Sequence, residues 1–220
     1  MPPQTYKLSP SALNLLKECP RCFWLTEHKI WRRPIGIFPS RPSGMDRILK
    51  THFDKFMDRG LLPPELCKDS ECENFKLFDD KKLLAEFRNS RKGLWFEDSD
   101  GNILHGGIDN ILVNKANNKL IVLDYKTRGY PLKEATHEHY QDQLDIYSWL
   151  LEKLGFHVEN FAYLLFYYPN EVLETGEVVF DTVLKKMKID IKNAEDLWKK
   201  ALELLNSECP EKGCQWCERF

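Results

Sequence analysis

The sequence has no long hydrophobic run and almost no excess of either charge. No stretch approaches the roughly 18 uninterrupted apolar residues of a membrane-spanning helix. Its 32 basic and 34 acidic side chains give a net charge of -2, so any surface for a polyanion must be a local patch. The first thirty residues also lack the basic-then-apolar order of a secretion signal. We therefore expect a cytoplasmic protein without a membrane partner.

Some apolar residues recur at helical spacing, and others form short runs bounded by turn residues. This pattern predicts a single α/β domain over residues 1–220. The order of these segments favours a central mixed β-sheet flanked by helices. Residues 61–93 show no firm pattern apart from a short helix near 79–88, and they are a candidate insert in a core spanning 43–205. Helices are predicted over residues 10–19, 45–57, 137–154 and 193–205, and strands over residues 94–96, 103–113, 120–125, 156–168 and 177–189.

Two predicted strands bring acidic residues and a lysine together. If the turn between them is centred near residues 116–117, Asp109 lies opposite Asp124, with Cβ atoms roughly 4.5 to 5.5 Å apart. Lys126 shares a strand face with Asp124 because side chains alternate with a period of two. Paired carboxylates suit Mg²⁺ or Mn²⁺. A solvated Asp to Lys ion pair is the alternative, but the apolar neighbours favour a site.

The seven cysteines fall into three tight groups, at 19 and 22, at 67 and 72, and at 209, 214 and 217. In a reducing compartment such grouping favours metal binding over disulfides. A tetrahedral zinc ion would take the two Cys-x2-Cys pairs, which are Cys19 with Cys22 and Cys214 with Cys217. This metal site would join two arms, residues 1–42 and 206–220.

Three motifs in order, Gly107-Ile-Asp109, Asp124-Tyr-Lys126 and Gln143-Leu-Asp-Ile-Tyr147, resemble the RecB-type branch of the PD-(D/E)xK nucleases. The resemblance implies a restriction-endonuclease-like core and a metal-dependent deoxyribonuclease. Asp109, Asp124 and the Tyr125 carbonyl would then be metal ligands. Lys126 would be the catalytic lysine, and Gln143 and Tyr147 would support it.

The same family often carries a histidine metal ligand on a helix before the sheet, and His52 is the candidate here. Relatives such as AddB and the CRISPR-associated exonucleases hold a [4Fe-4S] cluster with one N-terminal and three C-terminal cysteines. The resemblance therefore implies Cys19, Cys209, Cys214 and Cys217 as cluster ligands. Because the Cys-x4-Cys-x2-Cys spacing departs from the family pattern, Cys22 and zinc remain the alternative.

The expected substrate is DNA, cut by an exonuclease that acts on single strands or ends in repair, recombination or CRISPR-type defence. No Gly-x4-Gly-Lys-Ser/Thr motif is present, so unwinding would need a helicase or a CRISPR-adaptation partner. Two alternatives are a non-catalytic nucleic-acid-binding module and a redox iron–sulfur protein. A local basic and aromatic region could contact phosphates and bases, and it comprises Arg21, His28, Lys29, Arg32, Arg33 and Arg41 with Trp24, Trp31 and Phe38.

Overall fold

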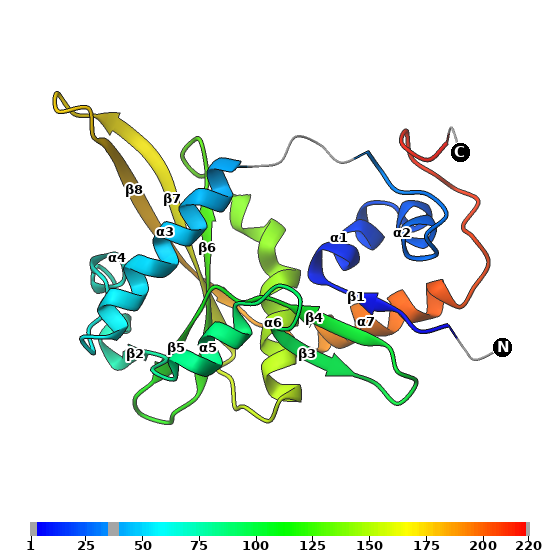
Figure 1. Cartoon of the computed structure of the whole chain (residues 1–220), viewed down its shortest axis with the longest axis horizontal. Helices are drawn as coiled ribbons and strands as arrows, with labels where there is room; N and C mark the ends of the chain where they lie inside the picture. The colour runs from blue at the N-terminus through cyan, green and yellow to red at the C-terminus, as the bar shows by residue number, and fades with distance from the viewer. Residues whose placement is uncertain (1–3, 35–39, 219–220) are drawn as a thin grey trace.

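The computed structural model describes residues 4–34 and 40–218, and it has a mixed α/β fold with two sheets flanked by helices (Figure 1). The larger sheet has the strand order β2-β5-β6-β7-β8, and the smaller has the order β1-β4-β3. The strands are β1 (Lys7–Leu8), β2 (Phe75–Leu77), β3 (Leu94–Glu97), β4 (Ile103–Gly106), β5 (Asn110–Asn114), β6 (Leu120–Thr127), β7 (Phe161–Val172) and β8 (Val178–Lys188). The α-helices are α1 (Pro10–Glu18), α2 (Pro20–Glu27), α3 (Ser40–Met57), α4 (Pro64–Cys67), α5 (Lys81–Phe87), α6 (Gln141–Lys153) and α7 (Ile191–Leu205).

The larger sheet is mixed because β6 and β7 pair in parallel while its other neighbours pair antiparallel. Parallel neighbours need a crossover connection, and α6 provides it. This helix packs against β6 through buried residues such as Leu144, Leu150 and Leu151. The predicted central mixed sheet with flanking helices is confirmed.

Alternate residues of β6 face two different helical layers. Ile121, Leu123 and Tyr125 join the core beneath α3 and α4, whereas Leu120 and Val122 join the core that includes α1, α6 and α7. Asp124 and Lys126 continue the second set, so both point toward the α6 side. The end of β6 therefore lies between α3 and α6.

The predicted strand over residues 103–113 is two strands in different sheets. β4 ends at Gly106, and the break covers Gly107 to Asp109, before β5. A Cβ atom on Gly106 would lie 2.6 Å from the Tyr147 ring, and one on Gly107 would lie 3.1 Å from the Arg88 carbonyl oxygen. The close packing between β4 and β5 therefore requires glycine at both positions, because glycine has no Cβ atom.

Residues 61–93 contain α4, a 3₁₀ helix (Ser70–Asn74), β2 and α5. The short helix expected near 79–88 is present as α5. Strand β2, which the sequence pattern did not reveal, pairs with β5 and forms an edge of the larger sheet. Part of this segment is therefore built into the sheet.

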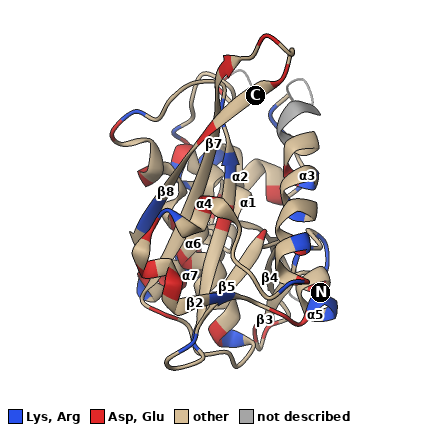
Figure 2. Ribbon diagram, turned by 90° about the vertical axis from the view of Figure 1, so that its left-hand side faces the viewer, with Lys and Arg blue, Asp and Glu red and all other residues tan. Residues whose placement is uncertain are grey.

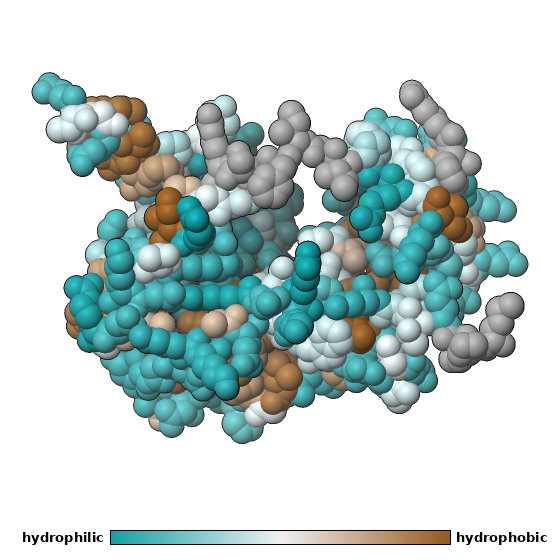
Figure 3. All heavy atoms as spheres, viewed as in Figure 1, coloured by the Kyte–Doolittle hydropathy of each residue, from teal (hydrophilic) through white to brown (hydrophobic). Residues whose placement is uncertain are grey.

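The face drawn in Figure 3 is largely hydrophilic, and Figure 2 shows basic and acidic residues interspersed along the ribbon. The β7–β8 hairpin projects from the body at the upper left of Figure 1 and carries exposed apolar side chains, among them Val172 and Val178. Within the described ranges, no helix has the length and hydropathy required to cross a bilayer.

Candidate active site and metal centre

The candidate active site lies where β6 emerges between α3 and α6. Asn110 pairs with Leu123 and Ile111 with Val122, which is the register predicted from the sequence. Asp109, just before β5, lies close to Asp124 in space, and its Oδ2 atom accepts a hydrogen bond of 2.9 Å from the Tyr125 backbone N–H. Local strand pairing therefore brings the two carboxylates together.

Asp124 is buried, with 2% of its surface exposed. Burial raises the pKa of this carboxyl to about 7; Lys126 opposes the rise and the negative charge of Asp109 adds to it. Asp124 Oδ2 forms an ion pair with the Lys126 ammonium, and it accepts a hydrogen bond from no other group that the structure describes. A buried carboxylate oxygen left in this way, beside a second carboxylate, fits a hard divalent cation.

Lys126 is held by side chains from the segment that follows β6. Its Nζ atom donates a hydrogen bond of 2.9 Å to Gln143 Oε1, and Gln143 Nε2 donates one of 2.9 Å to the Tyr147 hydroxyl. The Tyr140 ring lies 4.6 Å from the same ammonium. The sequence-predicted residues Lys126, Gln143 and Tyr147 thus form one connected chain of contacts.

Helix α3 adds a carboxylate that the sequence analysis missed. The Lys50 ammonium lies 2.9 Å from Asp46 and 3.0 Å from Asp109. Although burial opposes its charged form, the two carboxylates raise the pKa of Lys50. A cavity of about 210 Å³ adjoins this cluster and is lined by Asp46, Leu49, Tyr125, Lys126 and Thr127.

Asp46 could have been found from helical spacing. Asp46, Leu49 and Phe53 are three and four residues apart, so they share one face of α3, and Leu49 and Phe53 are buried against the sheet. The signal is a carboxylate one turn before the buried Leu49 and two turns before the buried Phe53, on the same side of the helix, although the Asp46 side chain itself is 42% exposed.

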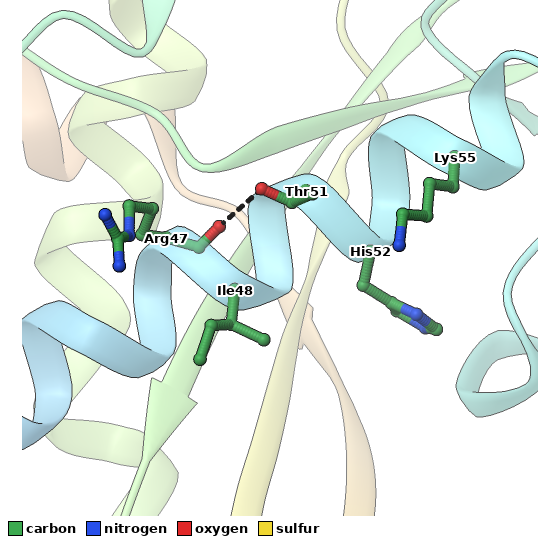
Figure 4. Close-up of a pocket in the computed structure, with 5 residues that line it drawn as sticks. All are labelled: Arg47, Ile48, Thr51, His52 and Lys55. Carbon is green, nitrogen blue, oxygen red and sulfur yellow. Dashed lines mark hydrogen bonds between the residues drawn. The ribbon is translucent and has the colours of Figure 1, made fainter.

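His52 pairs with Glu65 and not with Asp109 or Asp124, among the residues that the structure describes. Its Nε2 atom lies 3.1 Å from Glu65, and Glu65 also accepts a hydrogen bond of 3.1 Å from the Tyr167 hydroxyl. Figure 4 shows His52 on a different hollow of α3, with Arg47, Thr51 and Lys55. On α3, Asp46 and not His52 is linked to Asp109, because both carboxylates contact the Lys50 ammonium.

Arg88 supports the loop that carries Asp109. Its Nε atom donates to the Asp109 carbonyl oxygen at 2.9 Å, and its guanidinium pairs with Asp54 on α3 at 2.8 Å. Arg88, at the end of α5, therefore links the segment before β5 to helix α3. An arginine in a charged segment gives no sequence signal for this positioning role.

A second site lies at the end of the molecule where α2 meets the segment after α7. The four sulfur atoms of Cys19, Cys22, Cys214 and Cys217 all lie within 4.8 Å of one another. This cluster links the N- and C-terminal regions. Cys209, expected from the resemblance to iron–sulfur relatives, lies outside the set, and its sulfur is 3.6 Å from Arg21 Nη1.

Two arginines of the predicted basic and aromatic region are used at this cluster. Arg33 donates to Cys22 Sγ at 3.3 Å and to Cys214 Sγ at 3.6 Å. Arg21 donates to the Pro210 carbonyl oxygen at 2.8 Å. Phe38 and the Arg41 side chain lie outside the described residues.

The family model of the PD-(D/E)XK nuclease superfamily matches residues 39–219. The chain therefore belongs to this superfamily, whose name indicates a nuclease. Among curated proteins, none matches the chain.

Proposed function

We propose that the protein is a Mg²⁺- or Mn²⁺-dependent deoxyribonuclease, an exonuclease that acts on single-stranded or end-bearing DNA. The observation that carries this proposal is the buried Asp124 carboxylate, whose Oδ2 atom is paired with Lys126 alone and which lies beside Asp109, in a chain of the nuclease superfamily. A purely structural ion pair would not need a second carboxylate against the first.

Asp109, Asp124 and the Tyr125 carbonyl would hold the cation. When bound, the ion would lower the pKa of a water and offset the charge that develops on the phosphoryl oxygens. Lys126 lies next to Asp124, where an ammonium can orient a nucleophilic water or stabilise a phosphate oxygen. Gln143 keeps the ammonium in place because it accepts from Lys126 and donates to Tyr147.

The finer assignment is to the RecB-like branch, with a role in DNA repair, recombination or CRISPR-type defence and a helicase or adaptation protein as partner. The order of the three motifs and the contact between Gln143 and Lys126 support it. The four-cysteine cluster enters this proposal as a structural metal site.

The direct test is cleavage of end-labelled single- and double-stranded DNA by anaerobically purified protein with Mn²⁺, Mg²⁺ or EDTA. We expect cutting with either metal and none with EDTA, and the order in which labelled products appear gives the polarity. Folded protein that binds DNA but cuts it under no metal condition would identify a non-catalytic binding module instead.

Asp46 and His52 make a matched pair on α3 for locating the third acidic contribution to the metal site. We expect Asp46→Asn to weaken Mn²⁺ binding by roughly 10- to 100-fold, since it removes a charge beside Lys50 and Asp109. His52→Gln should leave Mn²⁺ affinity unchanged because its ring contacts Glu65. Isothermal titration calorimetry with Mn²⁺ measures both, and the reverse ranking would restore His52 as the helix-borne ligand.

A further inference from the structure

We infer that the four-cysteine cluster binds a single zinc ion through Cys19, Cys22, Cys214 and Cys217, and not the [4Fe-4S] cluster that the family resemblance implies. The inference is independent of nuclease activity. It depends on the spacing of the sulfur atoms, on their hydrogen bonds and on the position of Cys209.

The spacing of the sulfurs matches one ion. Cys19 and Cys217 are 3.7 Å apart, Cys22 and Cys214 are 3.5 Å apart, and Cys214 and Cys217 are 3.9 Å apart, measured between Sγ atoms. A regular tetrahedron with edges of 3.5 to 4.8 Å has its centre about 2.1 to 2.9 Å from each corner, a range that includes the Zn–S distance of about 2.3 Å. In a four-iron cluster each thiolate binds a different iron, so four irons and their sulfides would have to fit between these sulfurs.

In each cysteine pair the backbone N–H of one member donates to the sulfur of the other, toward the first cysteine in one pair and toward the last in the other. Cys19 is the N-cap of α2, and its Sγ atom accepts a hydrogen bond of 3.4 Å from the Cys22 backbone N–H. Cys217 Sγ accepts the Cys214 backbone N–H at 3.3 Å. Each Cys-x2-Cys segment is thus a short turn whose own backbone orients one thiolate, and two such turns facing each other are a donor set typical of structural zinc.

The surroundings compensate the charge of such a centre. Zinc with four thiolates carries a net charge of about -2, and three of the four cysteines are buried. The Arg33 guanidinium reaches one sulfur of each pair, at 3.3 Å from Cys22 and 3.6 Å from Cys214. It therefore adds positive charge and N–H donors where the excess negative charge would lie.

Cys209 is the residue that separates the two assignments. The iron–sulfur ligand set needs Cys209 and not Cys22, whereas the zinc set needs Cys22 and not Cys209. Cys22 is fully buried among the cluster sulfurs, while Cys209 is part-exposed and its sulfur contacts Arg21 and the Pro210 carbonyl oxygen. The geometry selects Cys22.

A zinc ion here would join α2 to the chain end across about 190 residues of sequence, as the separation of Cys22 and Cys214 shows. The helices it secures reach the active site: Ser9 and Pro10, at the start of α1, line a cavity of about 340 Å³ together with Gln143 and Tyr147. The centre would hold one wall beside the catalytic side chains without taking part in electron transfer.

The test is the metal content of protein produced in iron-supplemented cells and purified without oxygen. We expect about one zinc per chain, no acid-labile sulfide and no visible absorption from iron–sulfur charge transfer. About four irons and four sulfides per chain would overturn the inference, as would protein that retains neither metal.

Two matched variants identify the ligands. Cys22→Ser should lose zinc, measured as a fall in zinc per chain, and Cys209→Ser should keep it. Retention by Cys22→Ser with loss in Cys209→Ser would overturn the assignment. If Cys22→Ser does not fold, wild-type protein reconstituted with Co²⁺ provides the test, because tetrahedral thiolate coordination of Co²⁺ gives intense visible absorption bands. The Cys209→Ser protein should show the same bands. Absence of these bands from the wild-type protein would overturn the zinc assignment.

Discussion

Lys126→Met should lower the rate of metal-dependent DNA cleavage by roughly 10²- to 10⁴-fold while leaving the fold intact. The ammonium is the cationic group that contacts Asp124, and Gln143 holds it at 2.9 Å. Methionine keeps the length and apolar stem of the side chain but removes the charge. Single-turnover cleavage of labelled DNA measures the loss, and circular dichroism checks the fold.

Lys200→Met is the matched control for this change. Lys200 is exposed on α7, a helix that carries none of the site residues, so its replacement should leave cleavage within about twofold of the wild type. Equal cleavage by the wild type and folded Lys126→Met would show that the lysine acts only as a structural partner of Asp124. The proposed catalytic role would then be abandoned.

Phe53→Ala should reduce the free energy of unfolding by about 3 to 5 kcal/mol. Phe53 is fully buried beneath α3, and its ring centroid lies 4.6 Å from that of Tyr125 on β6. It is one of the buried side chains that attach the helix bearing Asp46 and Lys50 to the sheet. Truncation leaves a cavity at this junction, and urea denaturation followed by tryptophan fluorescence measures the loss.

Ile48→Ala on the same helix provides the comparison. Ile48 is 58% exposed, so its truncation should change the free energy of unfolding by less than about 0.5 kcal/mol. A similarly small effect for Phe53→Ala would mean that α3 is not anchored to the sheet through this contact. Its placement of Asp46 would then need another explanation.

The local periodicity of strands and helices allowed much of the candidate active site to be predicted from the sequence. The strand period of two places Asp124 and Lys126 on one face, and the turn near residues 116–117 sets the register that brings Asp109 close to Asp124. The helical period likewise puts Gln143 and Tyr147 on one face of α6. Each of these relations spans few residues, so local geometry is enough to state it.

Long-range packing decided the rest. Whether Asp46 or His52 lies beside the active-site carboxylates depends on the rotation of α3 about its axis. Leu49 and Phe53 set that rotation because their side chains are buried against the sheet. The edge strand β2 is recognisable only through its pairing with β5.

The cysteine cluster was also predicted only in part from the sequence. The spacing of the Cys-x2-Cys pairs in the sequence predicts metal binding, since two intervening residues allow both thiolates to reach one ion. Whether Cys22 or Cys209 completes the set of four depends on how the chain end docks against α2, where Cys22 Sγ meets Cys214 Sγ at 3.5 Å. The sequence by itself determined the strand and helix faces and the local cysteine pairs. Only the tertiary structure decided which distant side chains meet, because burial of apolar faces, which no local spacing encodes, orients the elements that carry them.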